Sequence, residues 1–61
     1  MIYFLFFDGV LGKLFVIEGD EDWVMEDAYE EALNVVDVAD ELEYIGIVSA
    51  FEVERQNYPV Y

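Results

Sequence analysis

The sequence predicts an α+β fold: a small antiparallel sheet of three or four strands, in the order β-β-(β)-α-β, packed on one amphipathic helix. Three features of the 61-residue chain support this prediction. Two short apolar runs flank a turn-forming segment near the N-terminus, a helical repeat of apolar and acidic residues fills the middle, and an alternating segment follows it. A chain of this length forms one small domain, so we assign residues 1–61 to a single domain.

The N-terminal third of the chain predicts a β-hairpin. Residues 1–7 (MIYFLFF) are apolar throughout, which is typical of a strand buried on both faces. The segment DGVLG at 8–12 has turn residues at both ends, and KLFVIE at 13–18 is the second strand. After the acidic turn GDED at 19–22, residues 23–25 (WVM) form a short third strand in the version that we favour.

The middle of the chain predicts a helix with two alternative starts. In the favoured version Asp27 is the N-cap, and Glu30 completes a capping box three residues later. In the other version Asp20 is the N-cap, which lengthens the helix and removes the third strand. Gly46 is the stop signal, after an exit over residues 43–45. The apolar side of this helix consists of Ala28, Tyr29, Ala32, Val35, Val36, Ala39 and Leu42.

The segment IVSAFEVER at 47–55 predicts the last strand. Its side chains alternate, with Phe51, Val53 and Arg55 on one face and two glutamates on the other. The residues that follow, QNYPVY at 56–61, form a polar tail that contains the chain's one proline.

The sheet needs a cover for its second face. One helix covers one face, but the first strand has large apolar side chains on both. A monomer rarely leaves a contiguous apolar patch of more than roughly a few hundred Å² in water. A twofold homodimer is the simplest cover. We therefore predict a homodimer whose interface includes Ile2, Phe4 and Phe6.

The composition narrows the classes of function. The chain has 2 basic and 15 acidic residues, a net charge of −13, and neither cysteine nor histidine. There is thus no disulfide framework and the commonest general base is missing, so we predict that the protein is not an enzyme. The negative charge disfavours binding to nucleic acid or to an anionic membrane, and a basic protein is the expected partner. We find no targeting or membrane-spanning segment, which predicts a cytoplasmic protein, in the host cell cytoplasm if it is viral.

The acidic residues also resemble parts of metal and catalytic sites. From Asp20, the segment DEDWVMEDAYEE places acids at positions 1, 3 and 12 of a calcium loop. Positions 5 and 6, which require a ligand and a glycine, are Val24 and Met25. Paired carboxylates for glycoside hydrolysis need a cleft, and a domain with one helix has little room for one. We therefore predict no metal site, no cofactor and no catalytic residue.

Opposite its apolar side, the predicted helix carries a row of carboxylates. Like-charge pairs four residues apart, such as Glu26–Glu30, each destabilise the helix slightly. From Glu26 to Glu41 a helix rises roughly 22 Å, so the carboxylates are spaced ~3 Å apart, close to the ~3.4 Å phosphate spacing of one DNA strand. The acidic turn before the helix and the glutamates of the last strand extend this field. The predicted partner-binding residues are Glu26, Asp27, Glu30, Glu31, Asp37, Asp40 and Glu41.

Two other interpretations of this acidic row, neither of which involves a binding partner, stay open. It could serve only to keep the protein soluble, or it could mark a halophile's protein. Halophile surfaces of this kind usually accompany a modest core, whereas 57% of this chain is hydrophobic.

Two segments, EDAYEEALNVVDVA and AFEVER, resemble the helix and last strand of the small bacteriophage inhibitors of bacterial RNA polymerase. In both, an acidic helix entry with a Glu-Ala-Leu step (here residues 31–33) precedes a Phe-Glu-Val strand (here residues 51–53). The resemblance implies an acidic contact with the polymerase. Those inhibitors also use arginine contacts, and this chain has a single arginine, Arg55. More broadly, the chain resembles small acidic bacteriophage host-takeover proteins of the DNA-mimic type. Their targets include RNA polymerase, nucleoid proteins such as the HU family, restriction enzymes and CRISPR effectors.

These features together predict a non-catalytic inhibitor. It binds a basic nucleic-acid-binding host protein (RNA polymerase, a nucleoid protein or a nuclease) through an acidic, DNA-mimicking surface. The alternative is a structural or assembly module that uses its apolar sheet face, with the acidity serving solubility.

Overall fold

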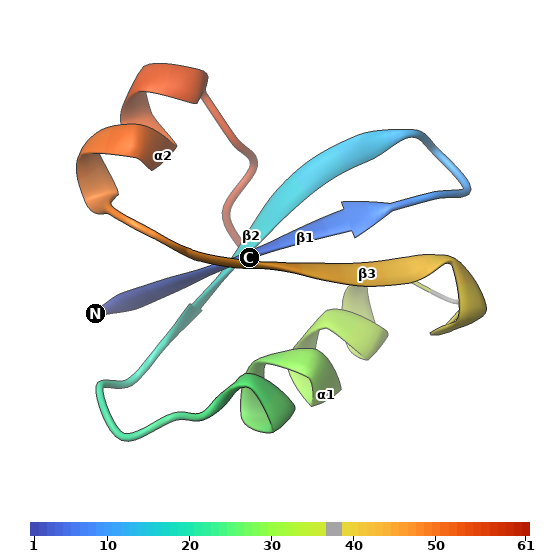
Figure 1. Cartoon of the computed structure of the whole chain (residues 1–61), viewed down its shortest axis with the longest axis horizontal. Coiled ribbons are helices and arrows are strands. Elements are labelled where there is room, and N and C mark those ends of the chain that lie inside the picture. The colour runs from blue at the N-terminus through green and yellow to red at the C-terminus, as the bar shows by residue number, and fades with distance from the viewer. Residues whose placement is uncertain (37–38) are drawn as a thin grey trace.

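A computed structural model describes residues 1–36 and 39–61 and confirms the α+β class. The elements in chain order are β1 (Ile2–Asp8), β2 (Lys13–Gly19), α1 (Met25–Val35), the 3₁₀ helix η1 (Ala39–Glu41), β3 (Leu42–Val48) and α2 (Ala50–Gln56). The strands form one antiparallel sheet in the order β2-β1-β3. Figure 1 shows α1 on one side of this sheet and α2 on the other, so the molecule has a second helix that the sequence analysis did not predict.

The N-terminal hairpin forms as predicted. β1 and β2 pair along their whole length, ending with Asp8 opposite Lys13. The Asp8 side chain closes the loop, because its Oδ1 accepts hydrogen bonds from the backbone N–H groups of Val10 (2.9 Å) and Leu11 (3.3 Å). Gly12 has a φ of 66°, a left-handed conformation that glycine adopts without steric cost. The turn residues at both ends of DGVLG thus have distinct physical roles.

Residues 23–25 do not form the predicted third strand. Trp23 turns inward, and its ring centroid lies 6.5 Å from that of Phe4. The indole also lies so close over Gly19 that a Cβ atom there would collide with it. Burial of this large ring stabilises a bend at the position where a strand would have continued.

The helix begins between the two predicted starts. The N-cap is Val24, whose backbone is extended, and α1 starts at Met25. Asp27, predicted as the N-cap, is the third residue of α1, and its Oδ2 accepts a hydrogen bond from the Val24 N–H (2.9 Å). Asp20, the alternative N-cap, lies in the turn before it. Asp27 therefore stabilises the helix start as the third residue of the capping box and not as the N-cap.

The helix ends earlier than predicted. α1 stops at Val35, and Val36 has the extended angles φ −118° and ψ 145°. Residues 42–45, predicted as the last turn and exit of the helix, belong to β3, which pairs with the second edge of β1. Gly46, predicted as the stop signal, lies within β3 opposite Leu5. Pairing with β1 supplies this segment with a ladder of backbone hydrogen bonds, which outweighs its local helical pattern.

The predicted last strand is only half correct. Ile47 and Val48 do belong to β3, but the residues that follow form α2. Ser49 is its N-cap, and the serine Oγ accepts a hydrogen bond from the Glu52 N–H (3.1 Å). The helix places Val53 against the sheet. The sequence signal for it was a serine followed three residues later by a glutamate, which is the sequence signature of a capping box.

Both faces of the sheet are covered, which gives the molecule two thin cores. The core on the α1 side consists of Phe4, Phe6, Phe15, Ile17, Ala28, Ala32 and Leu42. The core on the α2 side consists of Leu5, Val16 and Val53, with Tyr3, Val48 and Tyr58 at its margin. The alternation of side chains along β1 feeds both cores from one strand.

The matched variants Phe6→Ala and Phe51→Ala test this arrangement. Phe6 is fully buried, with its ring centroid 5.7 Å from that of Phe15 and 5.4 Å from that of Tyr44. Its truncation should cost about 3–5 kcal/mol, most of the stability of so small a domain. Phe51 is 72% exposed on α2, so its truncation should change the free energy of unfolding by less than about 0.5 kcal/mol. Urea denaturation measures the free energy of unfolding of both variants. Equal losses would indicate that Phe51 is buried in a strand, as the sequence analysis predicted, and would contradict its exposed place on α2.

The variant Ser49→Ala tests the unpredicted helix. Loss of the N-cap oxygen should cost ~1 kcal/mol and lower the melting temperature by roughly 4–8 °C. Ser49→Asn is the matched control and should stay within about 0.5 kcal/mol of the parent, because asparagine caps helices as well as serine does. Thermal unfolding followed by circular dichroism measures both. Equal stability of the alanine and asparagine variants would contradict the capped helix.

Candidate binding surface

The seven carboxylates predicted to form one row lie in two separate groups. Glu26, Asp27, Glu30 and Glu31 are all exposed in the N-terminal half of α1. Asp40 and Glu41 are exposed too, but they belong to η1, beyond the end of that helix. Asp37 lies outside the described residues. The single helical row of roughly 22 Å is therefore wrong, because the chain leaves the helix at Val35 to build β3.

Of the four acidic residues on α1, two stabilise the start of the helix and two do not. Glu26 and Asp27 lie in the first turn, where the positive end of the helix dipole favours negative charge, and Asp27 also accepts a capping hydrogen bond. Glu30 and Glu31 lie one turn later and face Glu26 and Asp27 as like-charge neighbours four residues apart. Neither of the two ion pairs within the described residues involves a carboxylate of α1. The charge of Glu30 and Glu31 thus opposes helix stability and has no structural role in the described chain.

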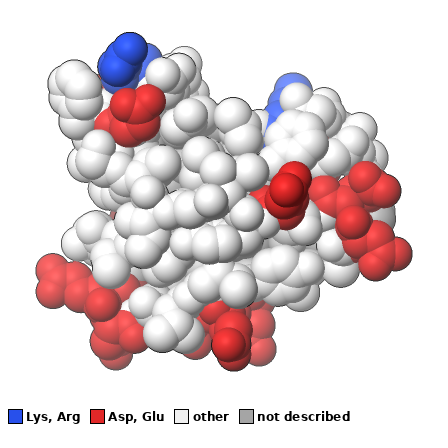
Figure 2. Space-filling view, viewed as in Figure 1, with Lys and Arg blue, Asp and Glu red and all other residues white. Residues whose placement is uncertain are grey.

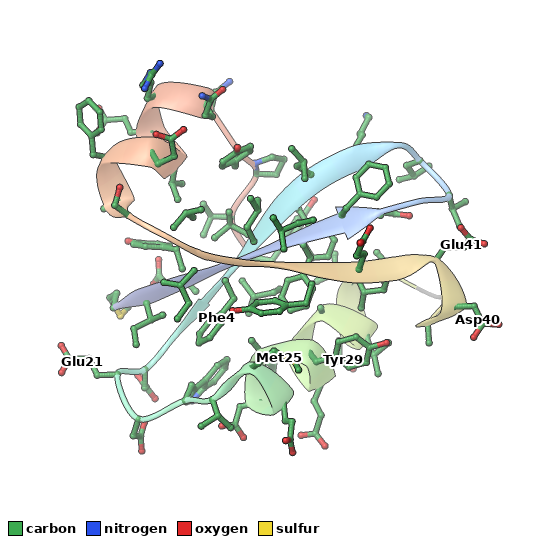
Figure 3. All side chains as sticks on the ribbon, in the orientation of Figure 1. Phe4, Glu21, Met25, Tyr29, Asp40 and Glu41 are labelled. Atoms are coloured by element: carbon green, nitrogen blue, oxygen red, sulfur yellow. The ribbon has the colours of Figure 1, made fainter. Side chains whose placement is uncertain are left out.

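The acidic turn at 20–22, which was predicted to extend the acidic field, lies shortly before α1 in the chain. All three of its residues are exposed, and the Glu21 side chain lies 4.0 Å from the N-terminal amine of Met1. In Figure 3 Glu21 points away from the body of the molecule, at the end opposite Asp40 and Glu41. Glu21 and the pair Asp40 and Glu41 therefore lie near opposite ends of the long dimension of the molecule, with α1 between them.

The second acidic group is held at the entry to β3. The Glu41 carbonyl accepts a hydrogen bond from the Gly9 N–H (2.8 Å), which ties η1 to the hairpin loop. The Tyr29 hydroxyl donates to the Ala39 carbonyl at 3.4 Å, which ties η1 to α1. With the exposed Glu43, the next charged residue along the chain, Asp40 and Glu41 form what we call the η1 acidic group.

The glutamates of the predicted last strand do not extend this field. Glu52 and Glu54 lie on α2, which covers the other face of the sheet. Glu52 is also engaged, because its Oε2 lies 3.8 Å from Arg55 Nη1 and its Oε1 accepts a hydrogen bond from Gln56 Nε2 at 3.0 Å. The α2 side is thus of mixed charge, whereas the charged residues of α1 and η1 are all acidic.

Figure 2 shows the result of this placement. In that view the Lys and Arg atoms appear along the upper edge, near α2 and the hairpin. Most Asp and Glu atoms lie along the left, lower and right margins, and the broad centre is largely free of charged atoms. In this view most of the acidic atoms lie apart from the basic ones, an arrangement that suits an electrostatically complementary partner.

The side chains predicted to form a dimer interface are used inside the chain. Phe4 and Phe6 are 1% and 0% exposed, and the half-buried Ile2 packs at the edge of the same core. The premise of that dimer was an uncovered second sheet face, and α2 covers it with Val53. A homodimer stays a prediction, but Phe4 and Phe6 offer it no surface. The alternative function, an assembly module built on an apolar sheet face, also stays a prediction, but Phe4 and Phe6 do not supply its surface.

The structure and the comparisons add no further assignment. Among residues 1–36 and 39–61, no group of three or more acidic side chains is arranged to hold a metal ion. Within the same ranges, no helix has the length and apolar character needed to cross a bilayer. Comparison with protein-family models, with curated proteins and with solved structures finds no match. Of the resemblance to phage polymerase inhibitors, residues 31–33 do lie in a helix, but residues 51–53 lie in α2 and not in a strand.

The sequence analysis missed an apolar part of this surface. Met25 and Tyr29, one turn apart on α1, line a shallow hollow of about 300 Å³ together with Glu26 and Glu30. Met25 was assigned to a strand, and Tyr29 to the buried side of the helix. Met25 and Tyr29 are four residues apart, so a helix that starts at Met25 places them on the same face. A correct prediction of the helix start would therefore have grouped them.

The variant Glu30→Lys tests the electrostatic strain on α1. It replaces the repulsion between residues 26 and 30 by a favourable glutamate–lysine pair, so the protein should be stabilised by about 0.4–1 kcal/mol. Urea denaturation at low salt measures the gain, which should shrink at 1 M salt, where the Debye length is ~3 Å. Glu30→Gln only removes the repulsion, so it should give about half of the gain in stability that Glu30→Lys gives. A loss of stability in Glu30→Lys would mean that this carboxylate supports the fold.

Proposed function

We propose that this protein is a non-catalytic inhibitor that binds a basic, nucleic-acid-binding host protein through its acidic α1 side. RNA polymerase, a nucleoid protein or a nuclease are targets of the right chemistry. The observation that carries the proposal is the exposed pair Glu30 and Glu31, which destabilises its own helix and enters neither of the described ion pairs. Charge that opposes folding is best explained by a partner that neutralises it.

The dimensions of the acidic surface support competition with DNA. The Cα atoms extend 27 Å along the longest axis, which is horizontal in Figure 3, and Glu21 and the η1 acidic group lie near its two ends. DNA phosphates follow one strand at ~3.4 Å intervals, so this length corresponds to about eight phosphates. Met25 and Tyr29 lie between these two ends (Figure 3), and Glu26 and Glu30 line the same hollow as they do. A groove of lysines and arginines shaped for DNA would meet charge at both ends.

The mechanism of inhibition would be competitive occupation. Long-range attraction steers an anion of net charge −13 toward a basic groove, which gives fast association and strong sensitivity to salt. Nucleic acid itself is repelled by the same charge, so the protein would act on the binder and not on the DNA. Action in the cytoplasm of a bacterial host, by a protein of bacteriophage origin, is part of this proposal.

The test is capture from a bacterial lysate with the tagged protein, elution by a salt gradient, and repetition with excess duplex DNA. The expected result is a DNA-binding protein that leaves at moderate salt and is displaced by DNA. A partner that withstands high salt and ignores DNA would contradict the proposal. Capture of no partner at all would favour an acidic surface that serves solubility only.

Two matched double variants locate the contact. Glu30→Lys/Glu31→Lys and Glu52→Lys/Glu54→Lys both raise the net charge by four, the first on α1 and the second on α2. Binding of the captured partner, measured by surface plasmon resonance, should weaken by at least about tenfold for the α1 variant and by less than about threefold for the α2 variant. Circular dichroism confirms that both fold. Equal losses would show that the partner senses only total charge.

A further inference from the structure

The two edges of the sheet are finished differently. Along the outer edge of β2, the Val16 N–H donates to the Pro59 carbonyl and the Tyr61 N–H to the Val16 carbonyl, both at 2.8 Å. The Glu18 N–H donates to the Tyr61 carbonyl at 3.1 Å. The C-terminal residues thus cover this edge with a short parallel bridge. Within residues 1–36 and 39–61, no hydrogen bond reaches the outer edge of β3, whose ladder runs only to β1.

β3 presents apolar side chains along this open edge. Its exposure alternates, and Ile45 and Ile47 are 51% and 63% exposed. Ile47 stands opposite Phe4, so it lies on the α1 side of the sheet, the side to which Met25 and Tyr29 belong. In Figure 1 β3 lies in front of the other strands, and the largely uncharged centre of Figure 2 covers the same area. An open row of backbone groups is therefore combined with exposed isoleucines.

The charges around the edge indicate what it accepts. Glu43 lies on β3 itself, and Asp40 and Glu41 precede it, so the beginning of the strand is acidic. A second copy of the chain would bring another net charge of −13 to this edge. Acidic side chains on and before this strand therefore discourage pairing between identical edges. A positively charged strand meets none of this repulsion.

We infer that the outer edge of β3 is a docking site for an extended segment of a basic partner protein, which adds to the sheet as a further strand. Its backbone pairs with β3, its apolar side chains cover Ile45 and Ile47, and its lysines or arginines reach Glu43 and the rest of the η1 acidic group. Backbone pairing supplies affinity and side chains supply selectivity in this mode of recognition. The inference rests on the proposed function for the charge of the partner and adds the structural form in which the partner is recognised.

The probe is an acetylated and amidated heptapeptide of alternating lysine and valine. Its matched control carries proline in place of each valine, which keeps the charge but removes backbone donors and disfavours a ladder. The ¹⁵N-labelled protein is titrated with each peptide, and amide shifts and hydrogen exchange are recorded. The expected result is that shifts and protection concentrate on β3, and that the control binds at least about tenfold more weakly.

Two protein variants separate the edge from the general apolar surface. Ile47→Ser should weaken the lysine–valine peptide by about tenfold, whereas Phe51→Ser, which alters an equally exposed side chain on α2, should leave its affinity unchanged. Equal binding of both peptides, with shifts spread over α1, would overturn edge docking and leave the proposed charge-based function standing. Absence of any response on β3 would overturn it as well.

Two further outcomes are distinguishable. Sedimentation velocity of the protein alone reports self-association, and a dimer that Ile47→Ser dissociates would overturn the inference by making a second copy the occupant. If the peptide docks on β3 but Glu30→Lys/Glu31→Lys has no effect on the captured partner, the α1 contact of the proposed function fails while edge docking is supported.

Discussion

The structure depends on the burial of one strand from four directions. β1 has β2 and β3 on its two edges, and its side chains enter cores on both faces, so Phe4, Leu5 and Phe6 are each at most 6% exposed. The other elements are arranged around this need. α1 and α2 cover its two faces, and the hairpin loop with η1 closes one end through the Gly9–Glu41 hydrogen bond. A chain of this size can bury only a small apolar area. Because β1 contributes side chains to both cores, the same strand serves both.

This arrangement also determines where the charge lies. α1 meets the sheet through Ala28 and Ala32, both fully buried, because only small residues let a helix approach strands that carry large rings. All its acidic residues are exposed, and the helix must tolerate their repulsion. Asp27 offsets part of it at the N-terminus through its capping hydrogen bond. Negative charge is therefore concentrated on the side where the core already supplies the stability to hold it.

Two features of the surface lack a partner within the described residues. The carboxylates of α1 form none of the described ion pairs, and the outer edge of β3 has no neighbouring strand. Each is moderately unfavourable for an isolated protein, and the proposed basic partner would satisfy both. Charge acts over long distances and sets the rate and the choice of partner, whereas a backbone ladder acts only at contact and sets its register. The same charge protects the open edge from pairing with another copy. An acidic surface and an exposed edge are thus compatible in one small protein.

The sequence by itself determined the elements whose signals are local. Asp8 and Gly12 specify the hairpin turn within five residues, the apolar runs on both sides specify its strands, and the acidic–apolar repeat specifies residues 28–35 of α1. The sequence also determines the net charge of −13, on which the proposal of a basic partner rests. These features involve neighbours only a few positions apart, so composition and spacing were sufficient to predict them.

Only the tertiary structure decided what happens after Val35. Residues 42–45 carry a helical continuation that is locally plausible, but the second edge of β1 needs a strand, and backbone pairing with distant residues outweighs local preference. Once β3 takes that place, residues 50–56 must return across the uncovered face, where a helix capped by Ser49 buries Val53 and a strand would have no neighbour. The single acidic row is divided for the same reason, and the exposure of Ile47 follows from its place at the end of the sheet. Long-range pairing cannot be read from spacing along the chain, because it depends on which edges and faces are still open when the segment folds against them.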